Sequence, residues 1–375
     1  MPSVPEQLDK LIVVKIGSST LVDAEGGVDR EFVTSLARQF AQLLGEGYHI
    51  VFVSSGAVAA GRERLGFTRR PTDMPSLQAC AATGQVALME VYAHELAALG
   101  VPCGQVLLTR RDFVDRECYL NARNTLFRLL DLGAIPVVNE NDTISVAEFA
   151  FGDNDMLGAI VSALVGADLY VILSDVEGLY DANPQEVPTA KLVRHVDHID
   201  SRVAAMAGGA GTSMGTGGMS SKVRAARAML ACGIPTVICE GRADEVIVDV
   251  AHGRQIGTRF EAPAGSSRES GRKLWIGLAE VPRGTLVVDD GAKRAIAREG
   301  ASVLPVGVVS TTGSYAEGDV VNVVDLNGVV LARGVARFSS DDMTRIRGLK
   351  SEVIARFMPE KAGQPAVHRD EMLVF

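Results

Sequence analysis

The sequence LIVVKIGSS (residues 11–19) decides the fold class. Leu11–Ile16 is a short run dominated by β-branched and other apolar residues, and it ends at Gly17. Residues 29–44 then carry apolar side chains at helical spacing. A continuous apolar run followed by an amphipathic helix is typical of a strand that is buried on both faces of a parallel sheet. The stretch therefore predicts the first strand of an α/β domain.

The same pattern recurs along residues 1–260. Helical segments separate further apolar runs at residues 50–53, 104–108, 134–139, 169–173 and 235–239. This alternation predicts an α/β sandwich with a mostly parallel central sheet. Ligands of such sheets bind beyond the carboxyl ends of the strands, so candidate site residues are sought there.

The character of the chain changes after Phe260. Residues 261–279, rich in Ser, Gly and charge, predict a linker with a connecting strand. Residues 280–360 contain short strand-like runs, with Asn327-Gly328 as a hairpin signal, and predict a small β-rich domain. Residues 361–375 are expected to be a C-terminal tail.

Composition excludes several classes of protein. The 375 residues are 47% hydrophobic and 22% charged, which is typical of a globular chain and not of a disordered one. With 46 acidic and 37 basic residues the net charge is −9, which disfavours long-range attraction to nucleic acid. Five cysteines without a CxxC pair indicate reduced thiols and a cytoplasmic location, and we expect no membrane span.

Polar residues follow the first two predicted strands directly. Lys15 lies at the end of the first strand beside Gly17, whose backbone can approach an anion, so this pair suits a phosphate site. The alternative is a lysine that snorkels at the sheet edge. Residues 54–57 (SSGA) open the next helix, and their N–H groups could hold a carboxylate or phosphate or simply cap the helix.

Four further segments carry chemistry-bearing residues at the same predicted edge. Residues 140–143 (ENDT) and 152–155 (GDND) bring carboxylates and amides, although such residues also make ordinary turns. Ser174-Asp175 follows another strand. Residues 215–222 (GTGGMSSK) open a helix and supply N–H donors and a lysine.

Common nucleotide-binding and metal-binding signatures are missing from the sequence. It contains no GxxxxGK[ST], no GxGxxG after the first strand, and no HRD or DFG set. His195 and His198 are the one close pair of histidines, and no cysteine or further histidine joins them. We therefore expect no metal ligand from the protein.

Taken in order, these segments resemble a known family. VVKIGSS, VSSGAVAAGR, LLTRRDF, PVVNENDT, FGDNDMLGA, LSDVEGLY and GTGGMSSK resemble the amino-acid kinase superfamily and, within it, the glutamate 5-kinase family. GTLVVDDGA, SVLPVGV, GDVVNV and VARGVARF resemble the PUA domain that many bacterial members carry. The resemblance covers nearly the whole chain and implies an amino-acid-kinase-like α/β sandwich with a PUA-like domain.

The resemblance also implies an activity. Members transfer the γ-phosphoryl group of ATP to the side-chain carboxylate of L-glutamate, giving γ-glutamyl phosphate, the first step of proline biosynthesis. It implies feedback inhibition by proline, a homo-oligomer (dimer or tetramer), and a reductase that consumes the product. Mg²⁺ would arrive with ATP as the cofactor.

Site roles carry over by position. The resemblance implies that glutamate contacts Ser55, Asp142 and Asn154, and that Asp155 holds two catalytic lysines, Lys15 and Lys222, in place. Backbone N–H groups of Gly17 and Gly56 would cradle the γ-phosphate. Members of the family often have Thr at the position of Ser221. Because Ser also carries a hydroxyl group, we expect little change in function. The residues implied to bind ATP are Lys15, Ser174, Asp175, Thr216, Gly217, Gly218, Met219, Ser220, Ser221 and Lys222.

This chemistry fits the residue types. A carboxylate acceptor is already ionised at pH 7, so it needs no general base. The difficulty is to bring one anion up to another, so catalysis requires positioning and positive charge.

Alternatives stay open at this point. Another kinase of the same superfamily, acting on aspartate, N-acetylglutamate, carbamate or UMP, shares the fold. An RNA-binding protein acting through the PUA-like domain would use its one basic concentration, although Asp341 and Asp342 can pair with it. The basic residues of that concentration are Arg333, Arg337, Arg345, Arg347 and Lys350.

A proline sensor is the third alternative. In that case proline would bind at a site that overlaps the glutamate site.

Overall fold

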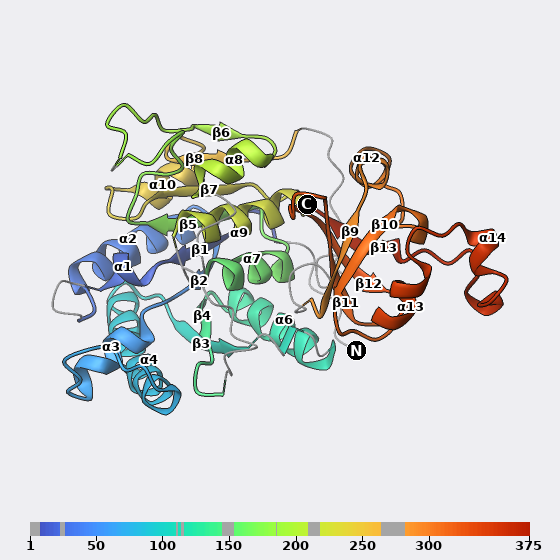
Figure 1. Cartoon of the computed structure of the whole chain (residues 1–375). Helices are drawn as coiled ribbons and strands as arrows, with labels where there is room; N and C mark the ends of the chain where they lie inside the picture. Colours follow the sequence, from blue (N-terminus) through green and yellow to red (C-terminus); the bar gives the residue numbers. More distant parts are fainter. Residues whose placement is uncertain are drawn as a thin grey trace. The chain divides into compact units, whose positions relative to one another are not determined.

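The computed structural model (Figure 1) describes most of the chain. It divides into two compact units, residues 1–266 and 267–375. None of the helices in the described part is long and apolar enough to span a membrane. Most of the predicted linker lies outside the described residues. The described ranges are 8–22, 27–109, 112–113, 116–144, 154–184, 186–208, 218–263 and 282–375.

The first unit is built on a sheet with the strand order β3-β4-β2-β1-β5-β7-β8-β6. β1 is central and pairs in parallel with β2 and β5, and β3, β4 and β7 continue the parallel arrangement. β8 pairs antiparallel with β7, and β6 pairs in parallel with β8, so these two short strands run opposite to the others. The predicted α/β class with a mostly parallel sheet is confirmed. The bounds are β1 Leu11–Ile16, β2 His49–Val53, β3 Cys103–Leu108, β4 Ile135–Glu140, β5 Leu169–Ser174, β6 His195–Val196, β7 Thr236–Glu240 and β8 Thr258–Phe260.

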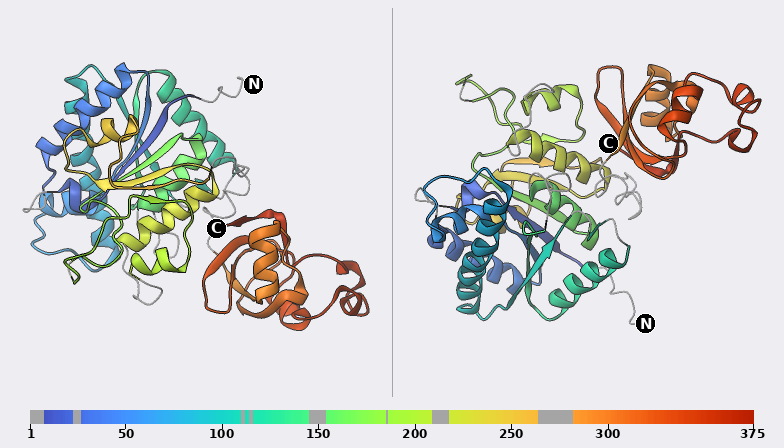
Figure 2. Two further views of the ribbon diagram at one scale, coloured as in Figure 1. Left: turned by 90° about the horizontal axis from the view of Figure 1, so that it is seen from above. Right: turned by 60° about the horizontal axis from the view of Figure 1, so that its bottom comes forward.

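Helices cover both faces of this sheet (Figures 1 and 2). Because side chains alternate along a strand, Ile12, Val14 and Ile16 of β1 join the core beneath α2, α4 and α10. Lys15 points to the opposite face, where α7 contacts β1 and packs beside α6 and α9. The bounds are α1 Ser18–Leu21, α2 Arg30–Gly45, α3 Ala57–Arg64, α4 Met74–Ala97, α6 Arg116–Asp131, α7 Asn154–Val165, α8 Ser201–Met206, α9 Met219–Ala231 and α10 Val246–Ala251.

Helices α3 and α4 approach each other backbone to backbone through two glycines. A Cβ added at Gly61 would lie 1.8 Å from the carbonyl oxygen of Cys80, and one at Gly84 would lie 1.7 Å from that of Ala57. Any larger residue would force the helices apart, so this crossing requires glycine at both positions. It fixes α3, which begins just after β2, against the long α4.

The second unit is a sheet with the order β10-β9-β11-β12-β13. The predicted Asn327-Gly328 turn lies between β11 and β12, with Gly328 at φ +80°. Its core includes Leu286, Tyr315 and Phe338. The bounds are β9 Gly284–Val288, α12 Asp290–Glu299, η1 Pro305–Gly307, β10 Val308–Gly313, β11 Val320–Val324, β12 Val330–Ala336, α13 Ser340–Ile346, α14 Ser351–Ile354, η2 Pro359–Lys361 and β13 Val367–Val374.

The expected tail, residues 361–375, needs a correction. Val367–Val374 forms the edge strand β13, antiparallel to β12, and Val367 and Leu373 are fully buried. The run His368–Glu371 is polar and hides the strand in the sequence, because an edge strand exposes one side to solvent. The β-rich domain therefore includes this segment.

Candidate active site

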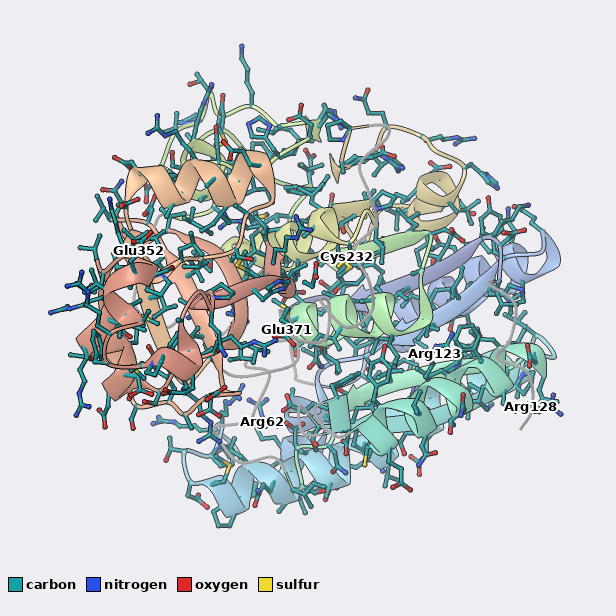
Figure 3. The ribbon with its side chains drawn as sticks, turned by 90° about the vertical axis from the view of Figure 1, so that its right-hand side faces the viewer. Arg62, Arg123, Arg128, Cys232, Glu352 and Glu371 are labelled. Carbon is teal, nitrogen blue, oxygen red and sulfur yellow. The ribbon has the colours of Figure 1, made fainter. Side chains whose placement is uncertain are left out.

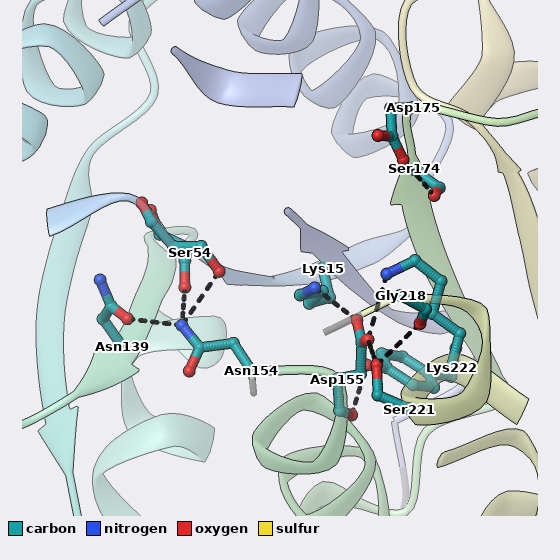
Figure 4. Close-up of polar contacts among 12 residues, drawn as sticks. Lys15, Ser54, Asn139, Asn154, Asp155, Ser174, Asp175, Gly218, Ser221 and Lys222 are labelled. Carbon is teal, nitrogen blue, oxygen red and sulfur yellow. Dashed lines mark hydrogen bonds and ion pairs between the residues drawn. The ribbon is translucent and has the colours of Figure 1, made fainter. Parts of the chain in front are cut away.

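Parallel strands place the candidate residues at one edge of the first sheet. The carboxyl ends of β1, β2, β4 and β5 meet there, and α7 begins at the same edge (Figure 4). Lys15 is the second-last residue of β1, and Ser54-Ser55 follows β2. Asn154 and Asp155 form the start of α7.

Asp155 joins two lysines that are far apart in the sequence. One carboxylate oxygen, Oδ1, contacts Lys15 Nζ, and the other, Oδ2, lies 3.2 Å from Lys222 Nζ. Ser221 Oγ donates to the same Oδ2 at 2.6 Å. All of these groups are buried, with exposed fractions of 4% for Lys15, 1% for Asp155 and 8% for Lys222. Figure 4 shows the lysines converging on Asp155 from β1 and α9.

The charges in this cluster do not cancel. Burial by itself raises the pKa of Asp155, but the positive charges of Lys15 and Lys222, with hydrogen bonds from Lys15 and Ser221, outweigh it and hold that pKa below its ordinary value. One carboxylate against two ammonium groups leaves a net charge of +1. Because a positive charge inside a protein is stabilised by nearby negative charge, these three side chains favour an anionic ligand.

Two glycines give the adjoining turns their conformation. Gly56 (φ +85°) precedes α3, and Gly218 (φ +100°) precedes α9. Both lie in the left-handed region that other residues avoid. An added Cβ at Gly218 would meet nothing within 4 Å, so its backbone borders open space. The N-terminus of α9, one turn before Lys222, suits a phosphate through its N–H groups and dipole.

Asn154 organises the neighbouring part of the site. Its Nδ2 donates to the carbonyl oxygen of Ser54 at 2.6 Å, to Asn139 Oδ1 at 2.8 Å and to Ser55 Oγ at 3.0 Å. Asn139 is 3% exposed, and its own Nδ2 has no hydrogen-bond partner among the described residues. A buried donor without a partner is costly, so a polar ligand that accepted a hydrogen bond from it would be favoured. The amide and hydroxyl groups suit a small polar acceptor molecule.

Asp142 lies just after β4. Burial and the negative charge of Glu140 raise the pKa of Asp142 to about 6, and the nearby positive charge of Arg70 only partly opposes this. A carboxylate in this environment would be stabilised by a positively charged partner such as a ligand ammonium group. No contact of Asp142 with Ser55 or Asn154 is recorded among the described residues.

Comparison with known proteins identifies the family. Residues 10–240 match the amino acid kinase family and residues 284–358 match the PUA domain. The glutamate 5-kinase of Syntrophotalea carbinolica is 44% identical over 365 residues, covering 97% of both chains. The glutamate 5-kinase of Vibrio vulnificus is 43% identical over 372 residues, which cover 99% of this chain and 98% of that protein. The glutamate 5-kinase of Bordetella pertussis is 45% identical over 365 residues, which cover 97% of this chain and 96% of that protein. The chain belongs to the amino acid kinase family, in its glutamate 5-kinase group. The predicted resemblance is confirmed.

Several ATP-site residues predicted for this amino acid kinase lie outside the Asp155 cluster. Ser174 ends β5 and Asp175 follows it. Ser174 Oγ donates to Asp175 Oδ1 at 3.1 Å, and Figure 4 shows the two residues apart from the cluster. Met219 and Ser220 form the first turn of α9. Thr216 and Gly217 lie outside the described residues, so their predicted contacts stay predictions.

The role predicted for the Gly17 backbone stays a prediction. Its N–H donates to the carbonyl oxygen of Leu173 at 3.3 Å and so extends the pairing of β1 with β5. Phosphate binding by this N–H would require that bond to be shared or exchanged. An added Cβ at Gly17 would be in ordinary van der Waals contact with Ser19 Oγ at 3.8 Å and with Lys15 Nζ at 3.9 Å.

The sequence prediction missed several residues of the site. Asn139, the second-last residue of β4, accepts from Asn154, so the rule that located Asp142 could have included it. Glu140 was named with the ENDT loop but given no role, and its negative charge raises the pKa of Asp142. Tyr92, whose hydroxyl lies 2.8 Å from Ser54 Oγ, had no sequence signal because it belongs to the helix core. Metal ligands were not expected, and the described residues contain no group of three His, Cys, Asp or Glu side chains that could hold a metal ion.

Proposed function

We propose that this chain transfers the γ-phosphoryl group of ATP to the side-chain carboxylate of L-glutamate, giving γ-glutamyl phosphate. The buried Lys15–Asp155–Lys222 cluster carries this proposal, because its net positive charge suits a phosphoryl group moving between two anions. It occurs in a chain that is 44% identical to a glutamate 5-kinase over 97% of both proteins. The reaction is the entry step of proline biosynthesis.

The two lysines supply the charge that the reaction needs. Because the acceptor carboxylate is ionised at neutral pH, no proton has to be removed from it. Lys15 and Lys222 stabilise the negative charge that develops on the transferred group and on the leaving ADP oxygen. Asp155 keeps both ammonium groups at the site, which orients them before ATP binds.

The acceptor binds beside this cluster. We assign L-glutamate to Ser55, Asn154 and Asp142, with Asp142 facing the α-ammonium group. The hydrogen bonds that fix Asn154 against Ser54 and Ser55 hold these groups ready. ATP lies along the start of α9, with Gly218, Met219, Ser220 and Ser221 at its phosphates and Ser174-Asp175 beyond them. The Gly56 backbone completes the cradle.

Mg²⁺ fits this site as a companion of ATP. It prefers several water and phosphate oxygens, so it needs few protein ligands. When bound it would neutralise charge on the nucleotide phosphates. The open backbone at Gly218 leaves space for such a hydrated complex, and the chain's own residues hold the nucleotide around it.

Four further properties belong to this proposal. We propose feedback inhibition by proline, which resembles cyclised glutamate and would overlap the Ser55–Asn154 region. We also propose a homo-oligomer of two or four chains, with a reductase as the consumer of the acyl phosphate. None of the five cysteines, all among the described residues, forms a disulfide, including Cys232 after the last turn of α9 (Figure 3), which favours a reducing compartment and a cytoplasmic reaction.

One assay tests the reaction and the substrate together. ADP release is measured with Mg-ATP and L-glutamate, L-aspartate, N-acetylglutamate, carbamate or UMP, with hydroxylamine present to trap an acyl phosphate. We expect release with L-glutamate alone, accompanied by its hydroxamate. Turnover with another acceptor would assign a different kinase activity of the same family. No turnover with any of them would overturn the proposal, and RNA binding by the second unit would then be tested by gel shift.

A further inference from the structure

A buried tyrosine supports the residue at the centre of the lysine cluster. Tyr170 lies on β5 and is fully buried. Its hydroxyl donates to the main-chain carbonyl oxygen of Asp155 at 2.8 Å. Because Val13 of β1 pairs with Tyr170 in the sheet, this side chain lies on the same face as Lys15, two residues further along β1.

Helix α7 is shaped to admit this hydroxyl. A Cβ added at Gly158 would lie 2.3 Å from the Tyr170 hydroxyl oxygen and 2.8 Å from its ring. Every residue other than glycine would therefore push the tyrosine away from the first turn of α7. Gly158 and Tyr170 form a matched pair that brings the hydroxyl to the backbone of Asp155.

A hydroxyl at this position needs an explanation. The neighbouring strand positions Val13 and Ile172 are apolar and fully buried. A phenylalanine would fill the same space without burying a polar group, whose burial is unfavourable unless it is hydrogen-bonded. The hydroxyl donates to Asp155, the residue whose carboxylate contacts both lysines. This bond therefore does more than satisfy a buried polar group in the core.

We propose that Tyr170 is a positioning residue for the phosphoryl transfer and acts through Asp155. This inference rests on the proposed function. The hydroxyl fixes the backbone of Asp155, so that Oδ1 stays on Lys15 and Oδ2 on Lys222. Small displacements of charged groups weaken transition-state stabilisation more than ground-state binding. Tyr170 therefore acts on the rate of the chemical step and touches neither substrate.

Steady-state kinetics of Tyr170→Phe tests this role. We expect kcat for ADP release to fall about 3- to 10-fold, with KM for ATP and for glutamate within about twofold of the unchanged protein. The matched control is Tyr315→Phe, which removes another buried tyrosine hydroxyl, 2.6 Å from Thr311 Oγ1 in the second unit. We expect the control to leave both constants unchanged.

A double-mutant cycle shows whether Tyr170 acts through Asp155. In an Asp155→Asn background, Tyr170→Phe should have little further effect on kcat, because the carboxylate that it positions is gone. An equal loss in both backgrounds would overturn the proposal. If Asp155→Asn has no measurable turnover, the cycle cannot be completed. The test is then whether Tyr170→Phe alone lowers kcat while both KM values stay within about twofold.

The remaining outcomes are also decisive. Unchanged kcat in Tyr170→Phe would overturn the positioning role while leaving the proposed function intact. Absence of turnover in the unaltered protein would instead contradict the proposed function. If Tyr170→Phe does not fold, Tyr170→Leu is measured in the same way. Failure of both variants to fold would assign the hydroxyl to the stability of the fold and overturn the proposal.

Discussion

Asn154 and Asp155 are consecutive in the chain, yet their side chains bind two different parts of the site. Asn154 donates to Ser54 and Ser55, at the end of β2, whereas Asp155 contacts Lys15 on β1 and Lys222 on α9. The first turn of α7 thus couples the proposed acceptor region to the proposed phosphoryl region. Substitutions of these neighbours should consequently have different kinetic effects.

Replacement of the α9 lysine should impair the chemical step. For Lys222→Ala we expect kcat to fall about 100-fold or more, because the lost charge matters most in the transition state. Folding should be kept, since Asp155 retains Lys15 and Ser221 as partners. The assay is ADP release with thermal unfolding in parallel, and Lys350→Ala, an exposed lysine of the second unit, is the control. Near-normal kcat would remove Lys222 from the mechanism.

Replacement of the neighbouring amide should affect glutamate. Asn154→Ala removes three hydrogen bonds that fix Ser54, Ser55 and Asn139. We expect KM for glutamate to rise about tenfold or more, while KM for ATP changes little. Initial rates at varied concentrations of each substrate measure both constants. A rise confined to KM for ATP would show that the two substrate regions have been assigned the wrong way round.

Much of the fold follows from local sequence. The apolar runs predicted β1, β2, β3, β4, β5 and β7 to within two residues at either end, because buried strands need continuous apolar side chains. β6 and β8 span two and three residues and are too short to show a pattern. The close crossing of α3 and α4 depends on Gly61 and Gly84 meeting in space, which spacing along the chain does not reveal.

Part of the site was also predictable, because the apolar runs locate the ends of the strands. Lys15 lies near the end of β1, and Ser55 and Asp142 follow strands, so topology alone brings them to one edge. The sequence does not show that the Asp155 carboxylate contacts both Lys15 and Lys222. These contacts arise from the tertiary structure, because the lysines are 140 and 67 positions away from Asp155 in the chain. Tyr170 was missed because a tyrosine within an apolar strand is typical of core.

The pH dependence should report on Asp142. Its pKa is raised to about 6, so the ionised form that pairs with an ammonium group is lost below that pH. We expect kcat/KM for glutamate to fall about tenfold from pH 7 to pH 5, because this ratio follows ionisation of the free protein. Asp142→Asn should have a low kcat/KM without this step. An identical step in both proteins would assign it to another group.

The same raised pKa has a consequence for stability. Between the ordinary pKa of 3.8 and the folded value of about 6, the folded state binds more protons than the unfolded state, so stability falls as pH rises through this window. The shift of about two units corresponds to at most about 3 kcal/mol. Asp142→Asn should therefore be more stable than the unaltered protein at pH 7 and similar to it below pH 4. Chemical unfolding at both pH values measures this difference, and a variant that is no more stable at pH 7 would contradict it.

The glycine crossing provides a test of the fold itself. Gly61→Ala and Gly84→Ala each place a methyl group within 2 Å of a backbone carbonyl oxygen of the facing helix, so the helices must separate. We expect each to lower the free energy of unfolding by about 3 kcal/mol or more, in the range of severe packing defects. Gly45→Ala is the matched control, because Gly45 ends α2 and its added Cβ meets nothing within 4 Å. There alanine should be neutral or slightly stabilising, by up to about 1 kcal/mol. Equal effects at Gly45 and Gly61 would mean that helix propensity, and not the close approach of α3 and α4, governs these positions.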